Sequence, residues 1–183
     1  MNKKEVALIT GGGTGIGFAI AKKLHSMNKT VVLTGRRKEK LLQAKKILKT
    51  RCHILEHDIS RLETIPKLVI DIEKKIGPIN YLINNAGIHL RKIAVETTDE
   101  EWKNVIDTNL NSVFSLSREC AKKMIRRKKG NIILVGSVTT IMGLPDVTAY
   151  ATSKTALSGL ARTLAIELGK YSINVNCICP GFI

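Results

Sequence analysis

TGGGTGIG, at residues 10–17, joins a short β-rich run, Val6 to Thr10, to an amphipathic segment, Gly15 to Ser26. Glycines between a strand and a helix allow a tight turn, let the backbone approach a pyrophosphate and leave the helix N-terminus open to phosphate oxygens. The spacing is TGxxxGxG, because an isoleucine stands where a strict GxGxxG pattern needs its last glycine. The turn predicts a dinucleotide site whose candidate residues are Gly11, Gly13, Thr14, Gly15, Ile16 and Gly17.

The rest of the chain alternates β-rich runs with longer amphipathic segments. We expect strands at residues 6–10, 30–35, 52–56, 81–83, 131–135 and 173–179, and helices over 15–26, 38–50, 61–76, 99–127 and 150–168. This alternation predicts the α/β class, as a doubly wound Rossmann-type parallel sheet with helices on both faces. Ligands in such folds bind at the carboxyl ends of the strands.

The composition fits one dinucleotide-binding domain over residues 1–183. Apolar residues make up 44% of the chain, which is enough for a core and excludes a disordered tail. The longest mostly apolar stretch, residues 130–144, is too short and too polar to cross a bilayer. The first residues lead into a strand rather than a secretory segment, so we expect a cytoplasmic protein with no membrane partner.

The net charge of +15 is unevenly distributed. Eight basic residues lie between Arg36 and Arg51, and seven between Arg118 and Lys129. Such a surplus attracts anions, including nucleic acid, a phosphorylated cofactor or an acidic protein. Aromatic residues are only 4% of the chain and no nucleic-acid motif accompanies the basic runs, so nucleic-acid binding is not favoured and solvated helix faces are the simpler interpretation.

The four cysteines form no CxxC pair, so we expect neither a metal site nor a disulfide framework. Cys177 and Cys179 are two residues apart in an expected strand. That spacing places both side chains on one face, as small apolar residues.

The end of the second expected strand bears on which cofactor is bound. A carboxylate there would hold a ribose 2′-hydroxyl and select NAD, but this chain has Arg36 and Arg37. Arginines can pair with a 2′-phosphate, so NADP(H) is favoured and NAD(H) stays open. Asp58, after the third strand, has two compatible interpretations: an N-cap for the following helix, or an adenine contact.

Further candidates follow the fourth and fifth strands. Asn85, Ala86 and Gly87 can pack on a cofactor and tie strand ends together. Tyr150 and Lys154 share one helix face, where an ammonium favours the phenolate and can lower the tyrosine pKa from its usual value near 10. Ser137 lies at the mouth of the same crevice, where its hydroxyl could hold a substrate carbonyl.

With these motifs in this order, the chain resembles the short-chain dehydrogenase/reductase family over essentially its whole length. The resemblance implies that Tyr150 is the general acid/base, that Ser137 orients the substrate oxygen and that Lys154 holds the nicotinamide ribose. It implies that Asn109 supports a proton relay through water, and that Pro180 and Gly181 contact the cofactor. The reaction implied is hydride transfer between nicotinamide and a ketone or secondary alcohol.

Within the family, residues 84–92 and 107–110 look most similar to gluconate 5-dehydrogenase-type sugar-acid oxidoreductases. Arg91 could pair with a substrate carboxylate, or be a solvated loop charge. The chain also resembles 3-oxoacyl-[acyl carrier protein] reductases, in which Arg126 and Arg127 could dock an acidic carrier protein.

The resemblance carries two more expectations. The expected helices over 99–127 and 150–168 form interfaces in the family, so a homo-oligomer is expected. Family members continue past Pro180-Gly181 with a substrate-covering lid and a further strand, which this sequence is expected to lack. An alternative of another class is a non-catalytic module that binds a cofactor or nucleic acid.

Overall fold

The computed structural model describes residues 5–182 and contains a six-stranded, entirely parallel sheet. The strands are β1 (Val6–Thr10), β2 (Thr30–Gly35), β3 (Cys52–Glu56), β4 (Ile79–Asn84), β5 (Gly130–Val135) and β6 (Ile173–Ile178). Their order in the sheet is β3-β2-β1-β4-β5-β6. The order reverses between β1 and β4, where a doubly wound fold opens its ligand crevice. The predicted fold class is confirmed.

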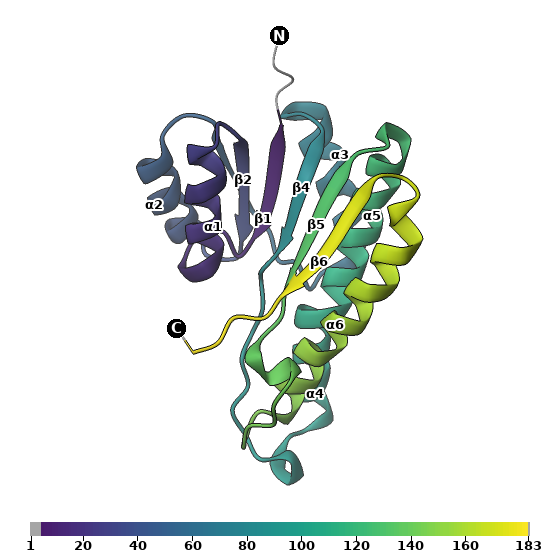
Figure 1. The fold of residues 1–183 in the computed structure, drawn as a ribbon. Helices are drawn as coiled ribbons and strands as arrows, with labels where there is room; N and C mark the ends of the chain where they lie inside the picture. Colours follow the sequence, from purple (N-terminus) through teal and green to yellow (C-terminus); the bar gives the residue numbers. More distant parts are fainter. Residues whose placement is uncertain (1–4, 183) are drawn as a thin grey trace.

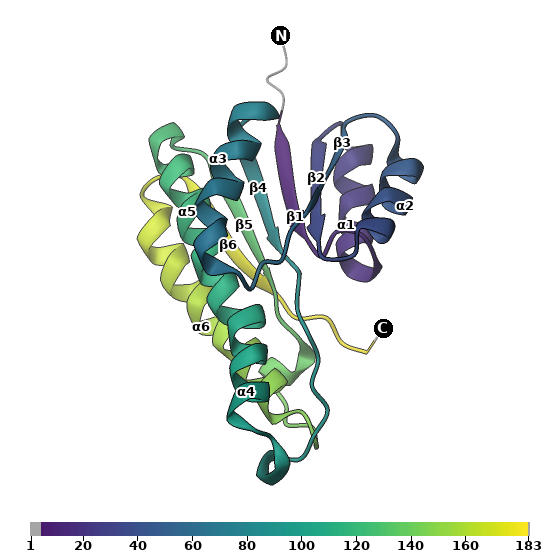
Figure 2. The same ribbon diagram turned by 180° about the vertical axis from the view of Figure 1, so that it is seen from behind.

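Helices lie on both faces of this sheet, although on one face they cover only the part formed by β1, β2 and β3 (Figures 1 and 2). They are α1 (Gly15–Ser26), α2 (Lys38–Leu48), α3 (Ile65–Lys75), α4 (Asp99–Ile106), α5 (Ser112–Arg127) and α6 (Thr148–Gly169). Figure 1 shows α1 and α2 on one face and α3, α5 and α6 on the other, as right-handed crossovers on either side of β1 require. α4 and the start of α6 extend beyond the carboxyl edge of the sheet (Figure 1).

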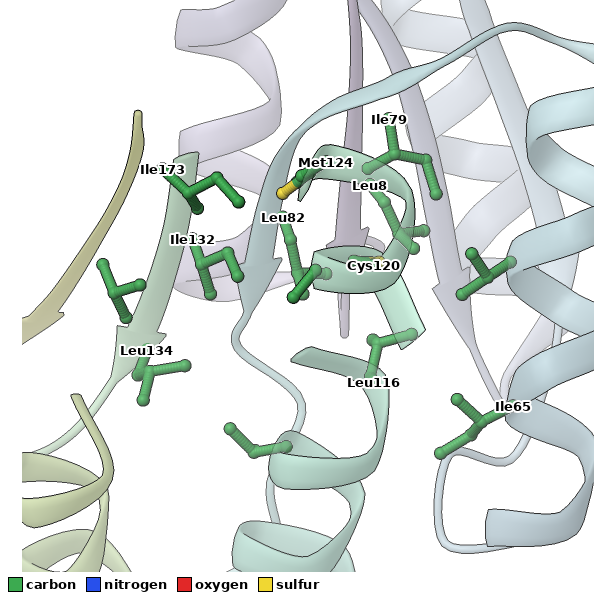
Figure 3. Packing of buried hydrophobic residues seen from close by; sticks show 14 of the residues in the cluster. Leu8, Ile65, Ile79, Leu82, Leu116, Cys120, Met124, Ile132, Leu134 and Ile173 are labelled. Carbon is green, nitrogen blue, oxygen red and sulfur yellow. The ribbon is translucent and has the colours of Figure 1, made fainter. Parts of the chain in front are cut away.

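Each face of the sheet has its own apolar core, because successive side chains of a strand point to opposite sides. Within β1, Val6 and Leu8 pack in one core, and Ala7 and Ile9 in the other. Figure 3 shows the first core, in which Leu82, Ile132 and Leu134 from the strands face α5. Burial of both faces explains why the central strands read as unbroken apolar runs.

The helix expected over residues 99–127 begins as predicted but is not uniform. Thr98 caps its N-terminus by accepting a hydrogen bond from the backbone N–H of Glu101, whose carboxylate accepts one from the Thr98 N–H. Between α4 and α5 lies one π-helical turn, Asp107–Asn111. Apolar periodicity did not indicate this turn.

None of the helices within residues 5–182 is long and apolar enough to span a membrane.

Candidate active site

Side-chain hydrogen bonds tie the ends of β1 and β4 together at the point where the strand order reverses. The Thr10 hydroxyl accepts hydrogen bonds from the backbone N–H groups of Asn85 (3.0 Å) and Ala86 (2.9 Å). The Asn85 amide in turn donates to the Thr10 carbonyl (2.9 Å) and to the Gly11 carbonyl (3.3 Å). The predicted tie between strand ends is confirmed, and it fixes the glycine turn against the start of the loop after β4.

The glycine turn is packed so closely that it admits no side chain at two of its positions. A Cβ atom on Gly17 would lie 2.4 Å from the Gly11 carbonyl oxygen and 2.5 Å from the Asn85 amide nitrogen. Gly11 has φ +63°, a conformation that favours glycine, and a Cβ there would approach the same amide. The backbone of the turn is therefore bare, as close approach of a pyrophosphate requires.

A hollow beside this turn carries the positive charge expected for a phosphorylated cofactor. Its lining includes Thr14 from the turn, Arg36, Arg37 and Lys40 from the end of β2 and the start of α2, and Asp58 after β3. The Arg37 guanidinium reaches the Thr14 hydroxyl at 3.5 Å. The three cations and the open turn thus fit a phosphorylated dinucleotide.

Asp58 lies in this hollow but does not cap a helix. Its carboxylate accepts hydrogen bonds from the Ser60 N–H (3.0 Å) and hydroxyl (2.8 Å), and α3 begins only at Ile65. Burial opposes the charged form, but those bonds and the nearby Arg36 and Arg61 outweigh it and lower the pKa of Asp58. The N-cap interpretation was wrong, because the carboxylate closes a local turn; the adenine contact stays a prediction.

A second hollow shares Asn85, Gly87 and Ile88 with the first, so the two meet at the end of β4. Ser137, Tyr150 and Lys154 all line it, although they come from the loop after β5 and from α6. Ile16, Pro180 and Gly181 complete its wall. The structure therefore brings together, in one cleft, the candidate residues predicted from distant parts of the sequence.

Lys154 is buried within this cleft and held by the sheet. Its side chain is only slightly exposed, and its Nζ donates to the Val135 carbonyl at 2.8 Å. The same nitrogen lies 5.8 Å from the centre of the Tyr150 ring, within the range of a cation–π contact. Burial lowers the pKa of the Lys154 ammonium to about 8, although the thiols of Cys177 and Cys179 act in the opposite direction.

Asn109 reaches the same region from the π-helical turn. It is fully buried, its amide oxygen accepts from the Ile88 N–H (2.8 Å), and its amide nitrogen donates to the Ile88 carbonyl (2.9 Å) and to the Ser153 hydroxyl (3.1 Å). A Cβ on Gly87 would lie 3.1 Å from Asn109 and 3.4 Å from the Lys154 ammonium nitrogen. The asparagine thus fixes the loop after β4 beside the lysine, and its part in a proton relay stays a prediction.

Arg91 lies elsewhere. Its side chain is 74% exposed, its guanidinium is 3.8 Å from the Asp146 carboxylate, and among the described residues it lines neither hollow. Its contact with a substrate carboxylate stays a prediction. His89 lines the second hollow instead, with its ring centre 4.6 Å from that of Tyr150.

The site predicted from sequence omitted both His89 and Lys40. Position alone could have indicated His89, since it follows Gly87 by two residues in the loop that leaves β4. Lys40 gave no such signal, because it reads as one more residue of a basic helix.

Comparison with known proteins agrees with this architecture. Residues 5–183 match the family model described as short chain dehydrogenase, and the chain belongs to that family. It is 38% identical over 177 residues to Nodulation protein G of Rhizobium sp. (strain N33), covering 97% of this chain and 72% of that protein. It is 37% identical over 179 residues to the 3-oxoacyl-[acyl-carrier-protein] reductase FabG of Rickettsia bellii (strain RML369-C), covering 98% and 73%.

A solved structure has the same fold over this entire chain. It is a gluconate 5-dehydrogenase from Burkholderia cenocepacia J2315 in complex with NADP and tartrate, with a TM-score of 0.91 and 26% identity, covering 100% of this chain and 72% of that one. Family and relatives together make this chain an oxidoreductase of the class that acts on CH–OH groups and ketones.

Proposed function

We propose that the chain is an NADP(H)-dependent oxidoreductase that interconverts a ketone and a secondary alcohol, with a sugar acid such as gluconate as the favoured substrate. The observation that carries the proposal is the joining of the two hollows. The basic one fits the phosphorylated adenosine half of a dinucleotide, and its neighbour holds Ser137, Tyr150 and Lys154. A cofactor that extends along the end of β4 would bring its nicotinamide to these side chains.

NADPH, when bound, supplies the hydride for the carbonyl carbon. Tyr150 gives its hydroxyl proton to the carbonyl oxygen during reduction and takes it back during oxidation. The Ser137 hydroxyl, in the same hollow, holds that oxygen in place. Lys154 holds positive charge under the tyrosine ring and offers its ammonium to the cofactor ribose.

A 3-oxoacyl-[acyl carrier protein] reductase is the second candidate, supported by the 37% identity to the Rickettsia bellii enzyme. Of the two predicted docking residues, Arg127 gives it little support. Arg127 is bonded to Glu73 and to the Ile79 carbonyl at the start of β4, which is the opposite edge of the sheet from the cleft. Turnover measured with sugar acids and with 3-oxoacyl thioesters distinguishes the two candidates.

The cofactor preference is tested at Arg36 and Arg37. Replacing both with alanine is expected to weaken NADPH binding about ten- to hundredfold, because hydrogen bonds to a charged group contribute about 1.5–3 kcal/mol. NADH binding should change far less, since NADH lacks the 2′-phosphate. Titration by calorimetry or cofactor fluorescence measures both affinities.

The matched control is Lys38→Ala, which removes the next charge along the chain, exposed at the start of α2 and outside the hollow. Equal losses for NADPH and NADH, or tighter binding of NADH by the unchanged protein, would contradict the NADP assignment.

The substrate class is tested at His89. His89→Phe keeps an aromatic ring against Tyr150 but removes the ring nitrogens, which in the second hollow can hydrogen-bond to a hydroxyl of a sugar acid. The loss of that one hydrogen bond is expected to lower kcat/KM for a sugar acid about tenfold. Cofactor affinity should not change. Arg91→Ala is the companion variant. If kcat/KM falls in Arg91→Ala and is unchanged in His89→Phe, Arg91 and not His89 contacts the substrate.

Three further expectations stay predictions: a cytoplasmic location, a homo-oligomer, and a single dinucleotide-binding domain over residues 1–183.

A further inference from the structure

Two thiols converge behind the candidate active site. The sulfur atoms of Cys177, in β6, and Cys179, just beyond it, are 3.9 Å apart. A Cβ on Gly136 would lie 3.0 Å from both sulfurs, so both sulfurs pack against this glycine, the first residue after β5. The prediction that both cysteines point to one face is confirmed, but Cys179 is exposed and is no core residue.

The backbone holds the two cysteines at a spacing that a disulfide can bridge. The Gly136 N–H donates to the Ile178 carbonyl (2.7 Å) and the Val138 N–H to the Pro180 carbonyl (2.8 Å), so parallel pairing continues past β6. Two residues along a strand span about 6.6 Å. Disulfides join Cα atoms up to about 6.8 Å apart. The strand spacing lies at the upper end of that range, so closing the disulfide requires a small backbone adjustment at Cys179, the first residue after β6.

The surroundings assign different roles to the two sulfurs. Cys179 is exposed, and its thiol donates to the Thr140 hydroxyl at 3.7 Å. Cys177 is half-buried, and burial raises the pKa of its thiol to about 11. An oxidant arriving from solvent therefore meets Cys179 first, and Cys177 stands within reach as the second sulfur.

The same backbone segment connects the thiols to the cleft. Gly136, beneath the two sulfurs, lies between Val135, whose carbonyl accepts the bond from Lys154, and Ser137. If the two sulfurs draw together above Gly136, they press on its backbone. That pressure shifts the adjoining Val135 carbonyl and Ser137, and with them the hydrogen bond that holds Lys154.

We propose that Cys177 and Cys179 are a peroxide-sensitive dithiol whose conversion to a disulfide lowers the activity of the adjacent cleft. The dithiol stands on its own geometry, and the effect on activity rests on the proposed function.

The reaction balances with hydrogen peroxide as the oxidant. The Cys179 sulfur attacks one peroxide oxygen and the O–O bond breaks. The departing hydroxide takes the thiol proton and leaves as water, and Cys179 becomes a sulfenic acid. The Cys177 sulfur then attacks the Cys179 sulfur, the S–O bond breaks, the S–S bond forms, and the proton of Cys177 leaves with the second water. The two sulfurs lose two electrons in total, which the peroxide gains, and a small dithiol reverses the change.

The test treats the folded, reduced protein with hydrogen peroxide, alkylates the remaining thiols and digests it with trypsin. Cleavage after Lys170 places both cysteines in the peptide 171–183, which contains no lysine or arginine, whereas Cys52 and Cys120 lie in other peptides. We expect this peptide to lose the mass of two hydrogens and to escape alkylation. In parallel, turnover should fall several-fold and return after dithiothreitol.

The variant Cys179→Ser should turn over substrate at the unchanged rate and should keep that rate after peroxide treatment. The control is Cys52→Ala, which removes a buried thiol elsewhere in the sheet and should lose turnover to peroxide as the unchanged protein does. The proposal is overturned if the peptide 171–183 stays fully alkylated, or if it gains oxygen in place of a disulfide. It is also overturned if the disulfide forms but neither turnover nor the thermal shift produced by NADPH changes. A protein that forms the disulfide but never turns over substrate contradicts the proposed function, not the dithiol.

Discussion

Tyr150→Phe is expected to lower kcat by a factor of about 10²–10⁴, the usual contribution of a positioned acid or base. The loss corresponds to about 3–5 kcal/mol of barrier. Only the hydroxyl is removed, because a phenylalanine ring keeps the contact with His89 and lies as before over Lys154. Steady-state absorbance of the nicotinamide band measures the rate, and a separate titration should show unchanged cofactor affinity.

The control is Tyr171→Phe, the same chemical change at a tyrosine packed against the core beyond α6. It should leave kcat unaltered. An undiminished rate in Tyr150→Phe would refute the assignment of proton transfer to this hydroxyl.

Gly17→Ala is expected to disable the cofactor site. The new methyl would stand 2.4 Å from the Gly11 carbonyl oxygen and 2.5 Å from the Asn85 amide, so the turn must open and the tie to β4 must weaken. Overpacking of this kind costs about 1–3 kcal/mol of unfolding free energy. Because the displaced backbone is also the expected phosphate cradle, NADPH binding should fall well beyond what the stability loss explains.

Gly159→Ala provides the comparison, since its Cβ would meet nothing closer than 3.9 Å, within α6. Alanine in a helix interior is favoured over glycine by about 1 kcal/mol, so this variant should melt at a higher temperature and bind NADPH normally. Normal cofactor affinity in Gly17→Ala would show that the glycine turn does not hold the pyrophosphate.

The fold was predictable because its local signals agree with one another. The strands β1, β2 and β3 lie at the residues expected, since apolar β-branched runs bounded by glycine or charge admit few other structures. The glycine turn and the NNAG segment could be placed at one crevice, because parallel strands bring their carboxyl ends to the same edge.

Other features depend on contacts that no local pattern contains. The amide of Asn109 bonds to Ile88 and Ser153, which are distant in sequence, and the π-helical turn places it there. The position of Arg91 beside Asp146 depends on how two loops meet. Likewise, the spacing of Tyr150 and Lys154 predicts a shared helix face, but only the fold shows that the ammonium bonds to the carbonyl of Val135.

The π-helical turn between α4 and α5 restricts how this part of the chain can change length. Each residue of an α-helix advances the side-chain direction by about 100°. The i→i+5 hydrogen bonds of a π-turn enclose one residue more than those of an α-helix, so deleting one residue within 107–111 would leave a regular α-turn. Inserting one residue there would instead rotate α5 by about 100° relative to α4, taking Leu116 and Met124 out of the core if Val105 kept its place. An added residue is therefore expected in the surface loops and not inside this helix.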